Sequence, residues 1–391
     1  MTSRELRRAS SSYRTPRVTR IILQDFRSYP ALDLEIDGSL IVFVGDNGAG
    51  KTNLLEALSL FSPGRGLRRA DLEDMAHEQG PGSFAVSLSL MDDDDLWRLG
   101  TGLEIQENDN STYRRYRING ATIGSAQHFT DHLRLVWLTP AFDGLFTGSA
   151  GDRRRFLDRL VLALDPAHAS RVSGLERALR TRNKLLEEPA PDSLWLDAIE
   201  REVAETGIAV AAARQEAIGR LSGLIHTMRD DASPFPWADI RLEGWVESTL
   251  IDRAAVDVED EFRALLKTQR ARDRAAGRAL IGPQASDLVV IHGPISVPAE
   301  RASTGEQKAL LIGIVLAHAR LVADVSGIAP IILLDEIAAH LDPKRRTALF
   351  DTLAQLGSQV FMTGADIASF SLMPAATRRY AVSQGQVDLI S

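Results

Sequence analysis

A glycine-rich run in the first part of the chain has residue types and spacing suited to phosphate chemistry. Its members, in the pattern G-x-x-x-x-G-K-[ST], are Gly45, Asp46, Asn47, Gly48, Ala49, Gly50, Lys51 and Thr52. Glycines let backbone N–H groups face an anion, and the positive end of a following helix adds to that field. An apolar segment before the run and helical spacing after it disfavour a chance turn. We predict an ATP site, with Lys51 on the β- and γ-phosphates and the Thr52 hydroxyl on Mg²⁺.

Two adjacent acids end an apolar run far along the chain. Residues 331–334 are Ile-Ile-Leu-Leu, and Asp335 and Glu336 follow them. A continuous apolar run is typical of a buried parallel strand, whose carboxyl end carries the site in α/β proteins. Alone, such a pair is more often a solvated strand end. Together with the phosphate loop, it predicts that Asp335 holds Mg²⁺ and that Glu336 and Lys51 are catalytic.

A short polar segment, Ala-Ser-Thr-Gly-Glu-Gln at 302–307, precedes another helical pattern. By itself its serine would simply cap a helix. Combined with the two motifs above, the segment resembles the signature of ABC-type ATPases, usually S-G-G-Q, and Asp342 stands where their D-loop follows the acids. The resemblance implies that Ser303, Gly305 and Asp342 contact ATP held by a second copy, with Ser303 catalytic. It therefore implies an ATP-dependent homodimer.

The elements that must position these residues follow from hydrophobic spacing. Strands are expected at 18–24, 31–36, 40–44, 84–91, 96–105, 112–118, 287–292, 331–334 and 359–363. Helices are expected at 152–164, 167–188, 193–229 and 257–276. The order predicts an α/β fold with an inserted, mostly helical lobe, and the resemblance of the motifs implies that the fold is an ABC-type P-loop ATPase head. We expect a flexible basic tail at 1–17, an N-terminal head segment at 18–150, the lobe at 151–277 and a C-terminal head segment at 278–391.

Composition restricts the class of protein. The 391 residues are 44% hydrophobic and 25% charged, as in ordinary soluble globular proteins. There is no cysteine, which excludes disulfides and thiolate metal sites. No apolar run approaches the length of a membrane span and no secretory signal follows the first methionine, so a cytoplasmic location is expected. The net charge of −8 means that any DNA contact must be local.

Arginines gather in three places. The expected tail carries Arg4, Arg7, Arg8, Arg14 and Arg17. The segment 64–69 contains Arg65, Arg68 and Arg69 between glycines, and the arginine fork suits phosphate oxygens, so these three are predicted to bind DNA. The cluster at 153–155 is as well interpreted as a solvated helix face as it is as a DNA contact.

Several motifs in order resemble the RecF family over nearly the whole chain after the tail. The segment 25–29 resembles its F-R-N-Y element, which implies that Arg27 helps to seat the nucleotide, and 64–69 resembles its basic segment. Thr139-Pro140, an R-R-x-F-L-D arrangement ending at Asp158, and Gly282-Pro283 also match. The resemblance implies an ATP-dependent, DNA-binding recombination mediator that engages gapped, duplex and single-stranded DNA. It also implies slow, DNA-stimulated hydrolysis and, with the partners RecR and RecO, promotion of RecA loading.

The chain departs from that family in two places. Val136 and Trp137 occupy the region of the glutamine that senses Mg²⁺, so the sensor is unassigned. Gln284 and Ala285 replace the histidine and basic residue that commonly follow Gly-Pro. The histidine that many ABC-type ATPases have after the last core strand is absent at 363–364, as is common in RecF-like proteins.

Three other classes of protein share some of the pattern. A transporter ATPase subunit would have a clear glutamine loop and would lack the segment ending at Asp158. An SMC-type structural ATPase would carry hundreds of residues of heptads, for which the inserted lobe is too short. An ATPase fused to a nuclease would need a further acidic metal cluster, which the sequence does not show.

Overall fold

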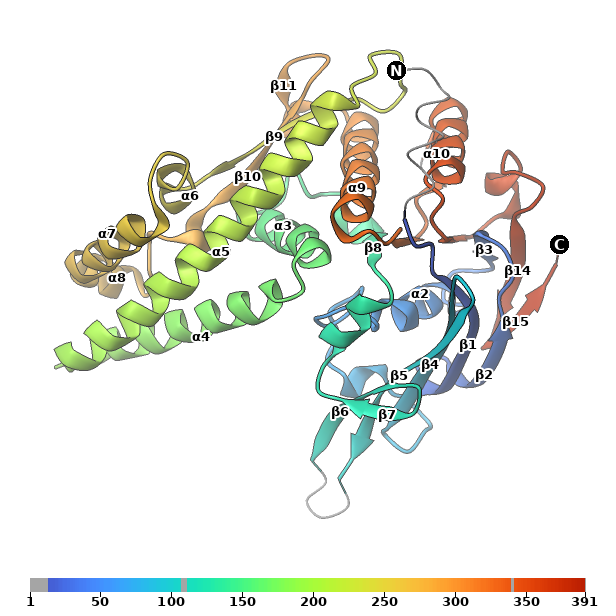
Figure 1. Ribbon diagram of the computed structural model, residues 1–391, viewed down its shortest axis with the longest axis horizontal. Helices are drawn as coiled ribbons and strands as arrows, with labels where there is room; N and C mark the ends of the chain where they lie inside the picture. Colours follow the sequence, from blue (N-terminus) through green and yellow to red (C-terminus); the bar gives the residue numbers. More distant parts are fainter. Residues whose placement is uncertain (1–12, 107–110, 339–340, 391) are drawn as a thin grey trace. The chain divides into compact units, whose positions relative to one another are not determined.

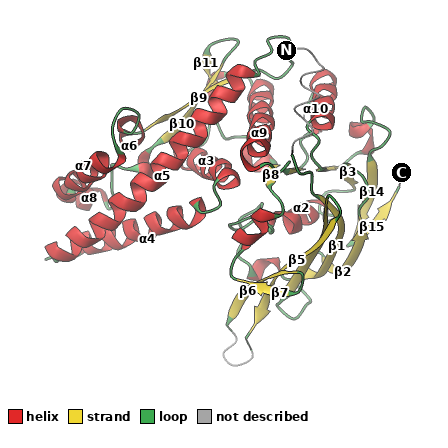
Figure 2. Cartoon of the chain, in the orientation of Figure 1, coloured by secondary structure: helices red, strands yellow, loops and turns green. Residues whose placement is uncertain are grey.

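The computed structural model describes residues 13–106, 111–338 and 341–390. Its chain forms two compact units (Figure 1). Unit 1 comprises Met1–Asp143, Asp230–Pro236 and Ser303–Ser391, and unit 2 comprises Gly144–Arg229 and Trp237–Ala302. Unit 1 combines sheets with helices, whereas unit 2 is mainly helical (Figure 2).

Unit 1 contains two six-stranded sheets. The antiparallel sheet has the order β2-β1-β4-β5-β6-β7, formed by Tyr29–Glu35, Arg17–Phe26, Phe84–Asp92, Asp95–Ile105, Thr112–Ile118 and Ala121–Ile123. The second sheet has the order β15-β14-β3-β13-β12-β8, formed by Gln386–Leu389, Arg378–Ser383, Leu40–Val44, Val360–Gly364, Ile331–Leu334 and Leu135–Leu138. Its strands pair in parallel except β14 with β15. Strands β3, β12 and β8 are buried along their whole length, as expected of parallel strands covered on both faces.

Three helices of unit 1 are α2 (Lys51–Ser59), α9 (Thr304–Ser326) and α10 (Pro343–Gln355), with 3₁₀ turns at Glu73–Met75, Ala126–Asp131, Pro140–Phe142 and Ile367–Phe370. The apolar side chains of α2 are fully buried in one core with strands of both sheets. Helix α9 alone among the described helices is long and apolar enough to cross a bilayer. Two thirds of its most apolar stretch (67%) is buried inside the protein, so it is accounted for as a core helix.

Unit 2 consists of helices around a small antiparallel sheet. The helices are α3 (Ala150–Leu164), α4 (His168–Glu187), α5 (Ser193–Thr227), α6 (Trp245–Thr249), α7 (Ala255–Thr268) and α8 (Arg270–Ala276). The sheet has the order β11-β10-β9, formed by Val297–Pro298, Asp287–His292 and Ala238–Glu243, with 3₁₀ turns at Pro283–Ala285 and Ala299–Arg301. Its apolar core centres on fully buried Val203, Val246, Val258 and Phe262.

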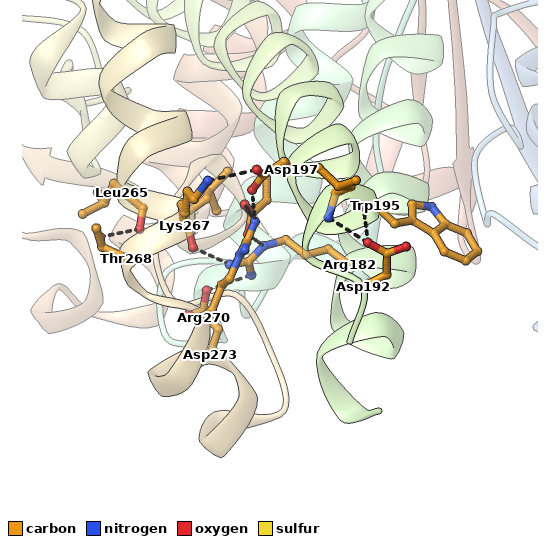
Figure 3. Close-up of polar contacts among 12 residues, drawn as sticks. Arg182, Asp192, Trp195, Asp197, Leu265, Lys267, Thr268, Arg270 and Asp273 are labelled. Atoms are coloured by element: carbon orange, nitrogen blue, oxygen red, sulfur yellow. Dashed lines mark hydrogen bonds and ion pairs between the residues drawn. The ribbon is translucent and has the colours of Figure 1, made fainter. Parts of the chain in front are cut away.

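A buried ionic network joins the helices of unit 2 (Figure 3). The guanidinium of Arg182 is fully buried and donates to Glu200 at 3.0 Å, to Asp273 at 2.8 Å and to the carbonyl of Leu266 at 2.8 Å. Arg270 also donates to Glu200 and to Asp197. Because each buried charge has an opposite charge beside it, α4, α5, α7 and α8 are held in one arrangement.

The boundaries between the two compact units differ from the segment bounds expected from the sequence. Residues 278–302 belong to unit 2, because β10 pairs with β9 through six residue pairs. Much of the expected tail, including Arg4, Arg7 and Arg8, lies outside the described residues. Arg14 and the residues after it form contacts within unit 1. The N–H of Arg14 donates to the carbonyl of Gly327 and its guanidinium donates to Asp92, and Arg17 begins β1.

Candidate nucleotide-binding site

The glycine-rich loop connects β3 to α2, and its backbone N–H groups can bind an anion. The φ values of Gly45, Gly48 and Gly50 are 159°, 83° and 108°, which residues other than glycine rarely adopt. A Cβ on Gly50 would also lie 2.6 Å from the Ser28 hydroxyl. Within the described residues no group accepts a hydrogen bond from the N–H of Asn47, Gly48 or Gly50. These N–H groups at the start of α2 are therefore available to a phosphate.

Tyr29 supports the last glycine of the loop. Its hydroxyl donates to the carbonyl of Gly50 at 3.1 Å, and the side chain is fully buried. Burial raises the pKa of Tyr29, so the hydroxyl stays protonated and remains a donor.

Lys51 lies folded back on the loop. Its Nζ donates to the carbonyls of Gly45 at 2.7 Å and Asp46 at 2.9 Å, and only 3% of the side chain is exposed. The same Nζ lies 3.8 Å from Oε1 of Glu336. A buried ammonium held mainly by carbonyls can exchange these partners for phosphate oxygens, which are stronger acceptors.

The two acids meet the loop at the end of β12. Oγ1 of Thr52 donates to Oδ1 of Asp335 at 2.8 Å, although the residues are 283 positions apart. Oδ1 of Asp335 also accepts from Oγ1 of Thr363 at 2.7 Å. A hydroxyl that donates to this carboxylate keeps its oxygen lone pairs for a cation, and carboxylate and hydroxyl oxygens are ligands that Mg²⁺ prefers. Thr52 and Asp335 therefore fit the Mg²⁺ role predicted from the sequence.

Glu336 adopts an unusual backbone conformation. Its φ is 54°, in the left-handed region, and its N–H donates to Oγ1 of Thr363 at 2.9 Å. The side chain is about one third exposed (32%), so a water molecule can reach the carboxylate. Left-handed backbone at a residue other than glycine is held in place by its surroundings and is enriched at active sites.

Arg27, expected to seat the nucleotide, has a partner within unit 1. Its guanidinium forms two hydrogen bonds of 2.9 Å with Glu56, whose side chain is fully buried on α2. The φ of Arg27 is 53°, and its carbonyl lies 2.7 Å from the Nδ1 of His77. The structure thus places Arg27 beside the helix that follows the phosphate loop, and its contact with nucleotide stays a prediction.

The signature-like segment begins α9 with a capping box. The Ser303 hydroxyl accepts from the N–H of Glu306 at 3.3 Å, and a Glu306 carboxylate oxygen accepts from the N–H of Ser303 at 3.0 Å. The capping role and the signature role are compatible, because Ser303 is exposed at the helix N-terminus. Whether Ser303 and Gly305 contact ATP in a second copy stays a prediction.

Asp342 caps α10 and accepts from the N–H of Arg345 at 3.0 Å. Arg345, which the sequence did not single out, also donates to the carbonyls of Gly305 at 3.2 Å and Pro234 at 3.2 Å. One side chain therefore connects the D-loop-like segment to the signature-like segment. Within the basic run at 344–346, Lys-Arg-Arg, the sequence gives no signal that Arg345 makes such a contact.

The three arginines predicted to bind DNA differ in their surroundings. Arg65 pairs with Asp71 at 2.9 Å, and Arg68 pairs with Glu56 at 3.0 Å. Arg69 is exposed, has a φ of 57° and forms no hydrogen bond or ion pair with any described residue. The charge of Arg69 is therefore the most available to a phosphate backbone.

The arginines before Asp158 serve unit 2 internally. Arg153 forms two hydrogen bonds of 2.7 Å with Asp287, and Arg154 donates to the carbonyl of Ser286 at 2.7 Å. The interpretation as a solvated helix face therefore fits Arg155, whose side chain is 54% exposed, and not its two neighbours.

Asp158 itself accepts two hydrogen bonds, of 2.8 and 2.9 Å, from Arg214, which also donates to the carbonyl of Pro283 at 2.7 Å. The segment ending at Asp158 and the Gly282-Pro283 segment thus meet through Arg214. The sequence indicated both segments but not the arginine that joins them.

Three comparisons bear on identity. The family of RecF/RecN/SMC N-terminal domains matches residues 17–388. The chain is 53% identical over 370 residues to the DNA replication and repair protein RecF of Mesorhizobium japonicum, covering 95% of this chain and 97% of the relative. The RecF protein of Rhizobium leguminosarum bv. trifolii is also 53% identical over 370 residues, covering 95% of this chain and 98% of the relative.

A solved structure has the same fold. The recombination mediator protein RecF-ATPrS in the RecFOR pathway superposes with a TM-score of 0.83 and 19% identity, covering 97% of this chain and all of that chain (100%). The α/β fold class predicted from the sequence, an ABC-type ATPase fold, is confirmed by this match and by the family assignment.

Proposed function

The chain belongs to the RecF family of DNA replication and repair proteins, and on that premise we propose that it is an ATP-dependent, DNA-binding recombination mediator. One observation carries the proposal. The 2.8 Å hydrogen bond between Thr52 and Asp335 brings the phosphate loop and the acidic strand end together. At the same place Nζ of Lys51 lies 3.8 Å from Oε1 of Glu336.

In the proposed mechanism the free N–H groups of the loop bind the phosphates of ATP. Lys51 leaves its carbonyl partners for the β- and γ-phosphates. Thr52 and Asp335 would hold Mg²⁺, which would neutralise charge on the phosphates. Glu336 orients the attacking water and accepts its proton, and the left-handed backbone of this residue directs the carboxylate toward that water.

The active unit in this proposal is a homodimer. Ser303, Gly305 and Asp342 of one copy contact ATP held by the other, so two nucleotides join two copies, and hydrolysis releases them. The exposed start of α9 supports this arrangement, because its N–H groups and helix dipole suit a γ-phosphate. Hydrolysis is slow and DNA-stimulated, and sets the lifetime of the homodimer.

DNA and protein partners complete the proposal. We place gapped or duplex DNA near single-strand junctions against Arg65, Arg68 and Arg69. RecR and RecO are the proposed partners in promoting RecA loading, supported by a relative of the same fold whose structure was solved as a member of the RecFOR pathway. The proposed location is the cytoplasm.

The test is fluorescence anisotropy of a labelled gapped duplex with ATP, with ADP and without nucleotide. We expect tighter binding with ATP than with ADP, because only ATP joins two copies around the DNA. Equal affinity in all three conditions would refute ATP-dependent DNA engagement.

A further inference from the structure

The hydroxyl of Thr363 occupies a central place in the sheet that forms the site. Strand β13, which carries Thr363, lies between β3, which leads to the phosphate loop, and β12, which ends at Asp335. Thr363 pairs in register with Phe43, two positions before Gly45, and only 1% of its surface is exposed. Its side chain therefore lies beside the acidic pair in a position that bulk water does not enter.

Both hydrogen-bonding capacities of this hydroxyl are used on the acidic pair. Oγ1 donates to Oδ1 of Asp335 at 2.7 Å and accepts from the N–H of Glu336 at 2.9 Å. The first bond orients the carboxylate of Asp335. The second holds the backbone of Glu336 where its φ is 54°, a conformation that relaxes unless neighbours fix it.

The bond to Asp335 matters because Thr52 has another task. The Thr52 proton goes to the same Oδ1, so that oxygen has two donors, and no described residue donates to Oδ2. Two donors on one oxygen fix the carboxylate plane and leave the second oxygen free for Mg²⁺ or its water shell. With Thr52 as the single donor, the carboxylate can rotate about that bond.

We propose that Thr363 is a positioning residue that aims Asp335 at Mg²⁺ and Glu336 at the attacking water. The inference rests on the proposed ATPase function and assigns a role to a threonine in a segment noted from the sequence only for its lack of a histidine. Hydrogen-bond partners of metal ligands typically contribute about 10- to 100-fold to metal affinity or activity. Among the described residues the Thr363 hydroxyl bonds to Asp335 and Glu336 and not to Lys51, so its loss should spare metal-free nucleotide binding.

Three variants separate positioning from simple packing. Thr363→Val keeps the shape and removes the hydroxyl, whereas Thr363→Ser keeps the hydroxyl. Thr130→Val is the matched control, since Thr130 is also buried in unit 1 and its hydroxyl donates to a carbonyl, that of Gln127 at 2.6 Å. Thr363→Ala serves as a second hydroxyl-free variant if the valine does not fold.

The readouts are the affinity for a fluorescent ATP analogue in EDTA and across a Mg²⁺ titration, followed by single-turnover hydrolysis. For Thr363→Val we expect metal-free affinity within about twofold of wild type, and a Mg²⁺ midpoint and a hydrolysis rate each worse by about 10-fold or more. Thr363→Ser and Thr130→Val should match wild type.

A Thr363→Val or Thr363→Ala protein with wild-type Mg²⁺ midpoint and rate would overturn the inference, as would a serine variant as impaired as the valine. Failure of the unmodified chain to bind the ATP analogue would be a different result. It would refute the proposed ATPase function itself, and the role of Thr363 with it.

Discussion

Replacing Arg182 with methionine should loosen unit 2 by an amount that the ionic network allows to be estimated. The change removes the guanidinium that donates to Glu200, Asp273 and the carbonyl of Leu266. Both carboxylates are almost fully buried, at 1% and 2% exposure. Breaking a buried pair by removing one partner typically costs about 3–5 kcal/mol.

The surviving partners set where in that range the cost falls. Glu200 keeps Arg270, which donates to both of its oxygens, whereas Asp273 keeps, among the described residues, only the N–H of Leu280 at 3.0 Å. One carboxylate rather than two is left uncompensated, so we expect about 3 kcal/mol. That loss corresponds to a roughly 100-fold larger equilibrium population of the opened helices, at 1.4 kcal/mol for each tenfold.

Hydrogen exchange with mass spectrometry measures this opening separately for the peptides of α4 and α5. Two controls accompany Arg182→Met. Arg270→Met removes a more exposed arginine (19%) and should cost less, and adding Asp273→Asn to Arg182→Met should recover some of the loss. If exchange in Arg182→Met stayed within about threefold of wild type, the network would not stabilise unit 2 as argued.

Three further changes test other aspects of the mechanism and the fold. Lys51→Met should weaken ATP binding about 100-fold or more in calorimetry, since charge-assisted hydrogen bonds are each worth roughly 1.5–3 kcal/mol, and unchanged affinity would contradict the role of Lys51. Replacing Arg65, Arg68 and Arg69 by alanine should lower DNA affinity and reduce the slope of log affinity against log salt concentration by at most about 0.9 for each lost contact on duplex DNA. Among the single variants, Arg69→Ala should have the largest effect. An unchanged slope in the triple variant would remove all three arginines from the interface. Burial opposes ionisation of Asp158, but hydrogen bonds from His168 and Arg214 hold its pKa below the ordinary value. Its contribution to the free energy of unfolding is therefore present above about pH 4 and is lost as pH falls through the lowered pKa. In urea titrations at a series of pH values, the free energy of unfolding of Asp158→Asn should fall less steeply in acid than that of wild type. Equal steepness in the two proteins would rule this out.

The elements of the fold that were predictable are those in which local pattern and burial agree. Segments 40–44 and 331–334 are uninterrupted apolar runs, and they form β3 and β12 at the centre of a sheet. Strand β8 (Leu135–Leu138) is just as buried but was not expected, since four apolar residues are too few to show a period. Helix α10 was also missed, although Asp342 and Pro343 form a typical helix start.

The site shows the same division. Spacing within a motif indicated Lys51, Thr52, Asp335 and Glu336, because the chemistry of phosphate binding constrains neighbouring residues. Thr363 and Arg345 gave no such signal, since each acts through contacts that exist only after distant strands or helices have packed. Arg27 was indicated by resemblance alone, and its pairing with buried Glu56 could not be deduced from either residue.

The most direct test of the central claim is sedimentation velocity of the Glu336→Gln protein with Mg²⁺ and ATP, with ADP, and without nucleotide. The glutamine removes the proton acceptor and leaves the Thr52–Asp335 contact intact, so ATP should bind and persist. We expect a dimer with ATP and a monomer in the other two conditions. A monomer at saturating ATP, with or without gapped DNA, would contradict the two-copy site.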